Sequence, residues 1–381
     1  MEPEIQPASP EPSPAATAID AALTSENSAQ ILGAPEPGGL GWVVIGSDGL
    51  RAGWSIAIFA ILMALFSMAV ALAFFKLHLV QQNGHISPRS ALFGELIPFL
   101  AMLGASALVA LLERRRNLLA FNLTGPRRGR HFLSGLAAGF LGLSVLVGAL
   151  SAGGWLHFGA VALTGAGIAK YAALWGCAFL LVGCVEEGLF RCYLQFTLTR
   201  GINFWWALGI EAVICLDLAL RARGNGIWGV YAVALLGLVP CLLLQLNKAS
   251  GAGFWQAAWV TSTVFGFIHT GNNGENWIGI FAAAAIGFVF CVSIWVTGSA
   301  WWAIGCHAAW DWAETYFYGT ADSGMPAQGH YLSTSPAGNV LWSGGTDGPE
   351  GSLLVLGVIL LLLVSLLVIY GRSRAEMAET A

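Results

Sequence analysis

Long, nearly uninterrupted runs of apolar residues recur along the chain from position 54 to position 370. A helix needs about 20 predominantly apolar residues to cross the hydrocarbon core of a bilayer. The pattern therefore predicts an all-α fold, a polytopic transmembrane helical bundle with about 8–10 spans. The expected spans cover residues 54–75, 91–112, 132–153, 168–190, 203–220, 227–246, 254–270, 277–297, 299–318 and 352–370.

Two of these runs differ from the others in their polar content. The fifth contains Glu211 and Asp217, and ionisable groups inside a span are costly. A half-buried or re-entrant segment is therefore an alternative to a full span there. The last run carries no charge between Leu353 and Tyr370, which is typical of a plain lipid-facing helix.

Changes in composition divide the chain into five parts. Residues 1–40 are rich in Pro, Ala, Ser and Glu, which is typical of a disordered tail. After this tail we expect N-terminal transmembrane helices over 41–164 and a core over 165–318. A Gly/Ser/Pro-rich loop over 319–351 follows, and 352–381 form a C-terminal transmembrane helix with a short basic tail.

The positions of arginine and lysine predict the orientation, because short cytoplasmic loops carry an excess of both. The loop over 113–131 holds six arginines, Arg114, Arg115, Arg116, Arg127, Arg128 and Arg130. We therefore expect this loop, and with ten spans both termini, to be cytoplasmic. The loop over 319–351 would be external, in a multi-pass protein of the cell membrane.

The overall composition narrows the class of protein further. The 381 residues are 56% hydrophobic and 10% charged, whereas soluble domains contain about 25% charged residues. The net charge of −4 argues against nucleic acid as a partner, and membrane lipid is the expected surrounding. The seven cysteines lie in apolar segments without a CxxC pair, so they predict neither a disulfide framework nor a thiolate zinc site.

The charged residues that lie inside apolar runs are therefore informative. Glu186, Glu187 and Arg191 fall within six positions at the end of the fourth run, although each such group costs at least about 2.5–3.5 kcal/mol in a bilayer. On a helix, Glu187 and Arg191 share a face and can neutralise each other. Glu186 points roughly 140° away from Arg191, which leaves its carboxylate free for chemistry.

Two further polar clusters follow in hydrophobic surroundings. His269 ends the seventh run, and His307 and Asp311 lie four residues apart in the ninth. Taken alone, His269 suits an interfacial or hydrogen-bonded histidine, and the other two suit a structural pair that satisfies both polar groups in lipid. Together with the first cluster they form one set of polar groups in or at the ends of spans.

Straight helices would not bring this set to one depth in the membrane. The fourth span ends at the cytoplasmic face, whereas the seventh would leave His269 near the external end. His307 lies in the first half of the ninth span. We therefore expect that one element is short, tilted or re-entrant, or that the boundaries differ, since irregular elements occur in membranes where they line a polar cavity.

In their order and spacing, the three clusters resemble the motifs of the CPBP family. This family comprises the CAAX prenyl proteases and bacteriocin-processing enzymes, also called type II CAAX endopeptidases or Ras-converting-enzyme-like proteins. The motifs in this chain are Glu186-Glu187-x-x-x-Arg191, Phe265-x-x-x-His269 and His307-x-x-x-Asp311. The resemblance covers roughly residues 165–318. The chain departs from the family in Cys192, where glycine is usual, and in a longer separation of the first two motifs, which contains two extra apolar runs.

The resemblance implies an intramembrane endopeptidase that acts on a membrane-anchored protein or peptide substrate. Peptide hydrolysis needs an activated water, a group that stabilises the oxyanion, and a proton donor for the leaving amine. We expect Glu186 and His269 to hold and deprotonate the water. His307 would polarise the scissile carbonyl, with Asp311 orienting its ring. The expected site residues are Glu186, Glu187, Arg191, His269, His307 and Asp311.

The residues leave two questions open. Two histidines and a carboxylate can bind zinc with one open position, and Glu186, His269 and His307 are the candidates. The same set also suits a metal-free glutamate protease. The intramembrane charges further fit a non-catalytic relative with an immunity or scaffold role, or a transporter, because such charges mark ion and proton pathways.

Overall fold

The structure is a computed structural model of the whole chain. The residues that it describes are 41–46, 49–79, 87–113, 117–222, 239, 242–244, 246, 251–272, 274–321 and 328–371. The expected tail over 1–40 and most of the expected span over 227–246 lie outside the described residues.

Helices make up most of the described chain, which confirms the expected all-α fold. The α-helices are α2 (Gly41–Val44), α3 (Ala52–Lys76), α4 (Pro88–Leu112), α5 (Arg128–Ala152), α6 (Ala166–Glu187), α7 (Gln195–Gly201), α8 (Phe204–Ala222), α10 (Ala252–Ile268), α11 (Trp277–Thr297), α12 (Trp301–Asp311), α13 (Val340–Ser343) and α14 (Leu354–Leu366). The short 3₁₀-helices are η1 (Leu118–Ala120), η3 (His269–Gly271) and η5 (Pro349–Gly351). The π-helices are η2 (Gly188–Leu194), η4 (Trp312–Tyr318) and η6 (Leu367–Gly371).

Six described helices are long and apolar enough to cross a membrane, so the chain is a multi-pass membrane protein. They are α3, α4, α5, the continuous helix from α6 through η2 to α7, α11, and α14 with η6. Each expected span other than 227–246 coincides with a described helix to within a few residues. However, α10 has 17 residues, which is fewer than the roughly 20 that a straight crossing needs. Helix α12 has 11 residues and continues without a break into η4, which ends at Tyr318.

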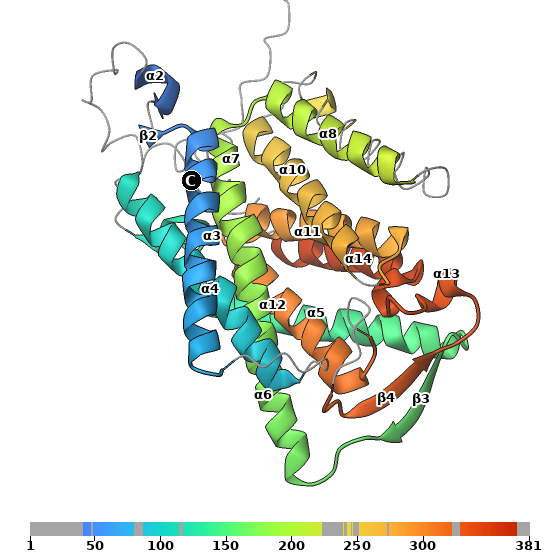
Figure 1. Cartoon of the computed structure of the whole chain (residues 1–381). Helices are drawn as coiled ribbons and strands as arrows, with labels where there is room; N and C mark the ends of the chain where they lie inside the picture. The colour runs from blue at the N-terminus through green and yellow to red at the C-terminus, as the bar shows by residue number, and fades with distance from the viewer. Residues whose placement is uncertain are drawn as a thin grey trace, which may run out of the picture.

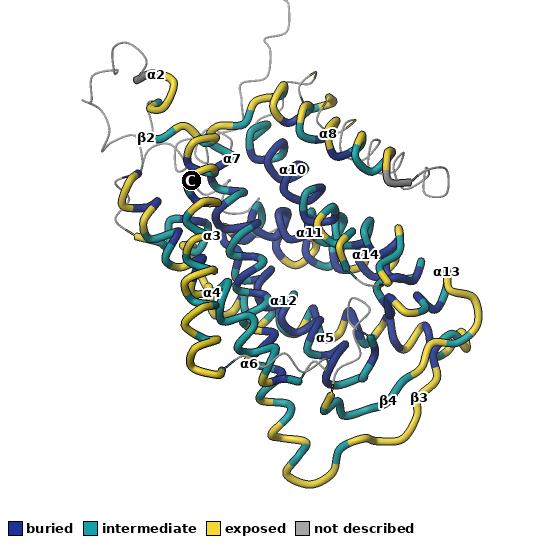
Figure 2. Tube along the Cα trace, viewed as in Figure 1, coloured by how far each residue is buried: buried dark blue, intermediate teal, exposed yellow. Residues whose placement is uncertain are grey.

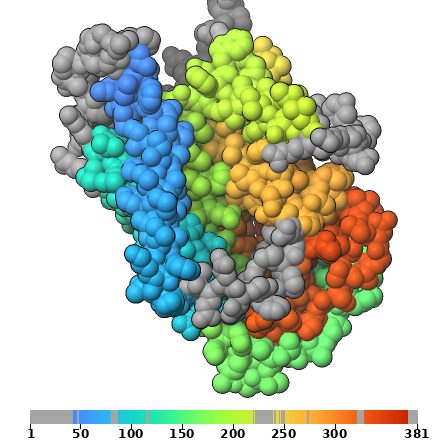
Figure 3. Space-filling view, in the orientation of Figure 1, coloured from blue at the N-terminus to red at the C-terminus, as the bar shows by residue number. Residues whose placement is uncertain are grey.

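Helix α3 lies at one edge of the bundle, beside α4 (Figures 1 and 3). Exposed apolar side chains follow one another along it at intervals of three and four residues, as the exposed positions in Figure 2 show. They are Ile61, Leu65, Met68, Leu72 and Phe75, each more than half exposed. Such spacing forms a stripe on one helix face, and in a multi-pass membrane protein this stripe faces lipid.

The main core lies where α5, α11, α12 and α14 meet, and a second cluster joins α3 and α4 to η2, α10 and α11. Helix α12 contributes to both, with Ala303 and Cys306 in the first and Ile304 in the second. The helix that carries His307 is therefore held from two sides.

The backbones of α5 and α12 approach each other unusually closely. A Cβ atom on Gly139 of α5 would lie 2.0 Å from the carbonyl oxygen of Cys306, and one on Gly305 of α12 would lie 2.3 Å from that of Phe132. No side chain fits at such distances. Small residues permit this kind of close helix contact in membranes, and here they fix the position of α12 in the bundle.

Two antiparallel ribbons of short strands accompany the helices. β1 (Ile45–Gly46) pairs with β2 (Gly49–Leu50), and β3 (Leu156–Val161) pairs with β4 (Leu332–Pro336). The segment expected to be a loop over 319–351 therefore contains β4, α13 and η5. Strands β3 and β4 lie on either side of the core segment in the sequence, so no hairpin turn joins them and marks their pairing.

We predict that Gly139→Ala destabilises the protein by about 1–3 kcal/mol, because the added methyl group overpacks the contact between α5 and α12. Thermal unfolding in detergent measures this. Gly148→Ala on the same helix is the matched control, since a Cβ there meets nothing within 4 Å. It should leave stability unchanged or raise it by up to about 1 kcal/mol. Equal unfolding temperatures for both variants would contradict the close contact.

Candidate active site

The first motif lies where a long α-helix changes its winding. Glu186 and Glu187 are the last two residues of α6, and the π-helix η2 begins at Gly188. A Cβ on Gly188 would lie 2.7 Å from the Met102 side chain of α4, so glycine leaves room for that neighbour. Short π-helical segments inside longer helices are frequent at functional sites, and this one sets the direction of the residues that follow.

Glu187 and Arg191 form the ion pair that their spacing predicts. Arg191 Nε lies 3.2 Å from Glu187 Oε2, and neither side chain has any exposed surface. The guanidinium lies 4.3 Å from the centre of the Phe265 ring and 5.5 Å from that of Phe290. A Cβ on Gly287 would lie 2.3 Å from Arg191 NH2. The charge is therefore enclosed by aromatic rings and by a space that glycine keeps open.

His307 on α12 connects the third motif to the first. Its Nδ1 lies 2.9 Å from Glu187 Oε1, and its Nε2 lies 3.8 Å from Glu186 Oε2 and 3.5 Å from Asp311 Oδ2. Because an ionised carboxylate only accepts hydrogen bonds, Nδ1–H donates to Glu187. We expected Asp311 to orient this ring. In the structure Asp311 lies near Nε2, and Glu187 accepts a hydrogen bond from the opposite nitrogen, Nδ1.

His269 presents one ring nitrogen for chemistry. It follows the last residue of α10, and its Nδ1 lies 2.7 Å from the backbone carbonyl oxygen of Phe265, one turn earlier. A carbonyl oxygen only accepts hydrogen bonds, so Nδ1 carries the proton. In the neutral ring Nε2 is then an acceptor, which is the form that can receive a hydrogen bond from water.

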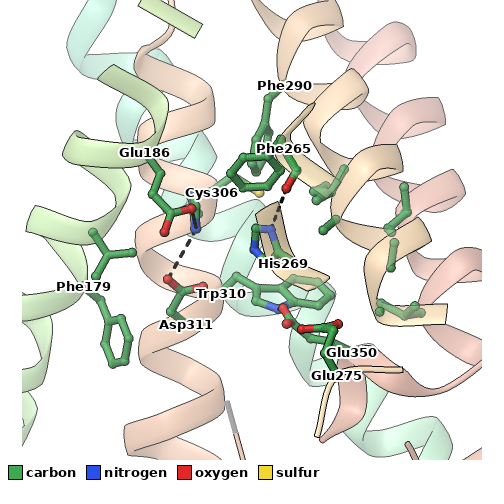
Figure 4. A pocket seen from close by; sticks show the side chains of 18 residues that line it. Phe179, Glu186, Phe265, His269, Glu275, Phe290, Cys306, Trp310, Asp311 and Glu350 are labelled. Carbon is green, nitrogen blue, oxygen red and sulfur yellow. Dashed lines mark hydrogen bonds and ion pairs between the residues drawn. The ribbon is translucent and has the colours of Figure 1, made fainter. Parts of the chain in front are cut away.

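A single cavity of about 210 Å³ is lined by Glu186, His269, His307 and Asp311. In Figure 4, Glu186 and Asp311 lie on one wall and His269 lies across from them. The volume accommodates several water molecules. The structure therefore brings the three motifs together at one place, which the lengths of straight helices did not lead us to expect. Helix α10, with 17 residues, ends directly before His269 of the second motif, and α12 carries the third motif.

The other end of the cavity contains residues that the sequence analysis did not single out. Glu275, Trp310 and Glu350 also line it (Figure 4), and Trp310 Nε1 donates a hydrogen bond to Glu350 Oε1 at 2.7 Å. Trp310 lies within the third motif, about one helical turn after His307. The motif alone therefore predicts that its side chain lies near the site. Glu275 and Glu350 lie between spans, where charged residues are ordinary and give no signal.

Zinc at Glu186, His269 and His307 is one of the two alternatives that the sequence leaves open. Within the described ranges, no group of three or more His, Cys, Asp and Glu side chains is arranged to hold a metal ion. Both histidines direct Nδ1 at protein oxygen atoms and keep Nε2 as the nitrogen that could bind a metal, as metal-binding histidines commonly do. As they are placed, the three candidates do not form a metal-binding group, and the mechanism below includes no step through a metal.

Comparison with known proteins adds an independent observation. The family model described as Type II CAAX prenyl endopeptidase Rce1-like matches residues 241–313. The chain carries an Rce1-like domain. This finding confirms the resemblance to the CPBP family. No curated protein and no solved structure matches the chain.

The Rce1-like domain contains the second and third motifs but not the first. It includes Phe265 to His269, at the end of α10 and the start of η3, and His307 to Asp311 on α12. Glu186 to Arg191 lie upstream, on α6 and η2. The cavity is thus shared between the matched segment and elements outside it, which are α6, η5 and α14. The contact between Glu187 and His307 joins the two.

We predict that Glu187→Gln destabilises the fold by about 3–5 kcal/mol, because it leaves the Arg191 guanidinium buried without its carboxylate. Thermal unfolding in detergent is the measurement. The matched control is Glu186→Gln at the adjacent position, whose side chain is 33% exposed and outside that pair. It should unfold close to the wild-type temperature; equal losses in both variants would contradict this account.

Proposed function

We propose that the chain is an intramembrane endopeptidase that hydrolyses peptide bonds of membrane-associated proteins. The observation that carries this proposal is the meeting of Glu186, His269, His307 and Asp311 on one cavity between membrane helices. The Rce1-like domain supports it at the level of the family, since it contributes two of the three motifs. No Gly-x-Ser-x-Gly motif competes as the source of a nucleophile.

In this proposal the nucleophile is a water molecule held by Glu186 and His269. Both present acceptors to the cavity, the carboxylate of Glu186 and Nε2 of neutral His269. A water that donates a hydrogen bond to each has its oxygen lone pairs free to attack a carbonyl carbon. As the C–O bond forms, the water proton passes to Glu186, which acts as the general base.

His307 stabilises the oxyanion that this attack creates. When its ring is protonated, Nδ1–H donates to Glu187 and Nε2–H remains as a donor on the cavity side, beside Asp311. A preorganised donor in a water-poor site is worth much more than the same donor in water. The tetrahedral intermediate then loses its amine as the C–N bond breaks, and Glu186 returns the proton to the leaving nitrogen.

The setting of the reaction is also part of the proposal. A membrane-anchored protein or peptide would be the substrate, and membrane lipid would surround the helices. We place the chain in the cell membrane with both termini in the cytoplasm, which the arginine-rich loop over 113–131 supports.

We predict that Glu186→Gln lowers kcat/KM for a membrane-tethered reporter by at least about 100-fold, the usual contribution of a general base. The assay uses full-length protein in liposomes and follows release of the reporter fragment. Glu211→Gln is the control, because Glu211 is a buried carboxylate on α8 that does not line the cavity. It should cleave at close to the wild-type rate.

Two outcomes of this assay would overturn the proposal. Equal processing by the wild type and by Glu186→Ala would remove the enzyme and favour a non-catalytic relative. Absence of cleavage by the wild type, together with proton- or ion-coupled transport in the same liposomes that Glu186→Gln abolishes, would identify a transporter.

We further predict that exhaustive chelation leaves reporter cleavage within about twofold of the untreated rate, because general-base catalysis here includes no metal-dependent step. The measurement compares protein dialysed against a strong zinc chelator with untreated protein. Loss of activity that added zinc restores would replace this mechanism with a metal-dependent one.

A further inference from the structure

The N-terminal end of α5 carries a concentration of positive charge. Arg127 is the N-cap residue of this helix, and Arg128 and Arg130 lie in its first turn, which contains no acidic residue. All three side chains are exposed. None of them forms an ion pair with another residue in the ranges that the structure describes. The described part of the protein therefore supplies no counter-charge for these three guanidinium groups.

This arrangement is unfavourable for the helix on its own. The N-terminus of an α-helix carries a partial positive charge, which attracts anions and repels cations within the first turn. Arg127 also adopts a left-handed backbone conformation, with φ of 53° and ψ of 30°, which is costly for a residue other than glycine, asparagine or aspartate. An anion bound at this end of α5 would relieve the repulsion among the like charges.

The exposed face of α5 is apolar beyond the arginines. Arg130 is followed, at intervals of three and four residues, by the exposed side chains of Leu133, Ala137, Leu141 and Val145. Such spacing forms one stripe along a helix, and in a multi-pass membrane protein this stripe faces lipid. From Arg130 to Leu141 the helix rises roughly 16 Å, which is about half the thickness of the hydrocarbon core. Charge and stripe together match the headgroup and the hydrocarbon chain of one leaflet lipid.

The π-helix η6 lies beside the start of this stripe. The hydroxyl groups of Ser134 and Tyr370 are 2.6 Å apart, and the Tyr370 ring packs edge-on against the His131 ring. Val368 and Ile369, directly before Tyr370, are more than half exposed. Two helical segments therefore provide apolar surface next to the arginines.

We propose that the N-terminal end of α5 is a binding site for an anionic phospholipid. The lipid phosphate accepts hydrogen bonds from the guanidinium groups, which suit phosphate because each can donate two in parallel. The acyl chains lie along the stripe from Leu133 to Val145 and beside η6. A soluble anion would satisfy the charge alone, whereas a phospholipid satisfies both the charge and the apolar surface.

The site is separate from the candidate active-site cavity, which none of these arginines lines, and it does not depend on the proposed function. Helix α5 packs against α12 and α14 in the main core. A lipid bound to α5 therefore stabilises the folded bundle as a whole, and thermal unfolding reports its binding.

The first test is the thermal unfolding temperature of the full-length protein in a nonionic detergent. Phosphatidylglycerol should raise this temperature more than phosphatidylcholine with identical acyl chains, because a ligand that binds the folded state stabilises it. In a triple variant with Arg127→Gln, Arg128→Gln and Arg130→Gln, the two lipids should act equally. Equal effects of the two lipids on the wild type would overturn the proposal.

Native mass spectrometry measures the affinity for each lipid directly. The preference for phosphatidylglycerol should fall about 100-fold in the triple variant, since each arginine near anionic lipid contributes about fivefold. The matched control replaces three other exposed cations by glutamine, Lys76, Arg89 and Lys170. They lie at the end of α3 and near the starts of α4 and α6, on the opposite face of an alternating bundle. An equal loss of preference in this control would reveal a general charge effect and overturn the proposal.

Two further measurements separate binding from folding and lipid from free phosphate. Without added lipid, the triple variant should unfold at the wild-type temperature or above it, because like-charge repulsion is removed. Should it fail to fold, Arg130→Gln takes its place, and an unchanged lipid preference there would overturn the proposal. Inorganic phosphate and glycerol phosphate should raise the unfolding temperature less than phosphatidylglycerol does. Equal stabilisation by them would leave the apolar stripe without a role and reject the lipid site.

Discussion

Glu187 is fully buried, so only other groups of the protein can stabilise its carboxylate. Both of its oxygen atoms have such a partner. Oε2 pairs with Arg191 and Oε1 accepts from His307. Removing a charge from water costs several kcal/mol unless good geometry compensates for it. Because Glu187 lies on α6 and His307 on α12, the hydrogen bond between them fixes the position of one helix relative to the other. Most of the site geometry depends on this contact.

The aromatic rings around Arg191 extend the same constraint to the second motif. Phe265 of α10 and Phe290 of α11 both lie against the guanidinium, and Phe265 also accepts the hydrogen bond that fixes His269. One residue therefore packs against the buried cation through its ring and orients the histidine through its backbone. The three motifs form a connected structure in which each carboxylate or imidazole is held by a group from another motif or by its own helix.

Both motif helices change from α to π winding directly after a motif carboxylate. η2 follows Glu187 and η4 follows Asp311. Wider winding changes which side chains share a face, so residues after the carboxylates point in directions that a uniform α-helix would not give.

The sequence predicted the helices well because lipid admits little else, and it predicted the three motifs because charges in lipid are rare. The contact between Glu187 and His307 joins residues 120 positions apart, and no local pattern can reveal such a pair. The π-helices and the pairing of β3 with β4 likewise depend on tertiary packing. Glu275 and Glu350 were missed because charges in loops are commonplace.

The placement of Glu186 and His269 in the cavity has a consequence for any chain that the proposed reaction would cut. In a helix each carbonyl oxygen accepts a hydrogen bond from the amide four residues later and side chains surround the backbone, so a water held by these two residues cannot reach the carbonyl carbon. A scissile segment must therefore enter unwound, with its amide groups bare of their usual partners. Hydrocarbon penalises bare amides heavily, so an intact membrane-crossing helix is a poor candidate. A segment that is already extended, such as an unwound helix end or a chain terminus next to a lipid anchor, can enter without first unfolding.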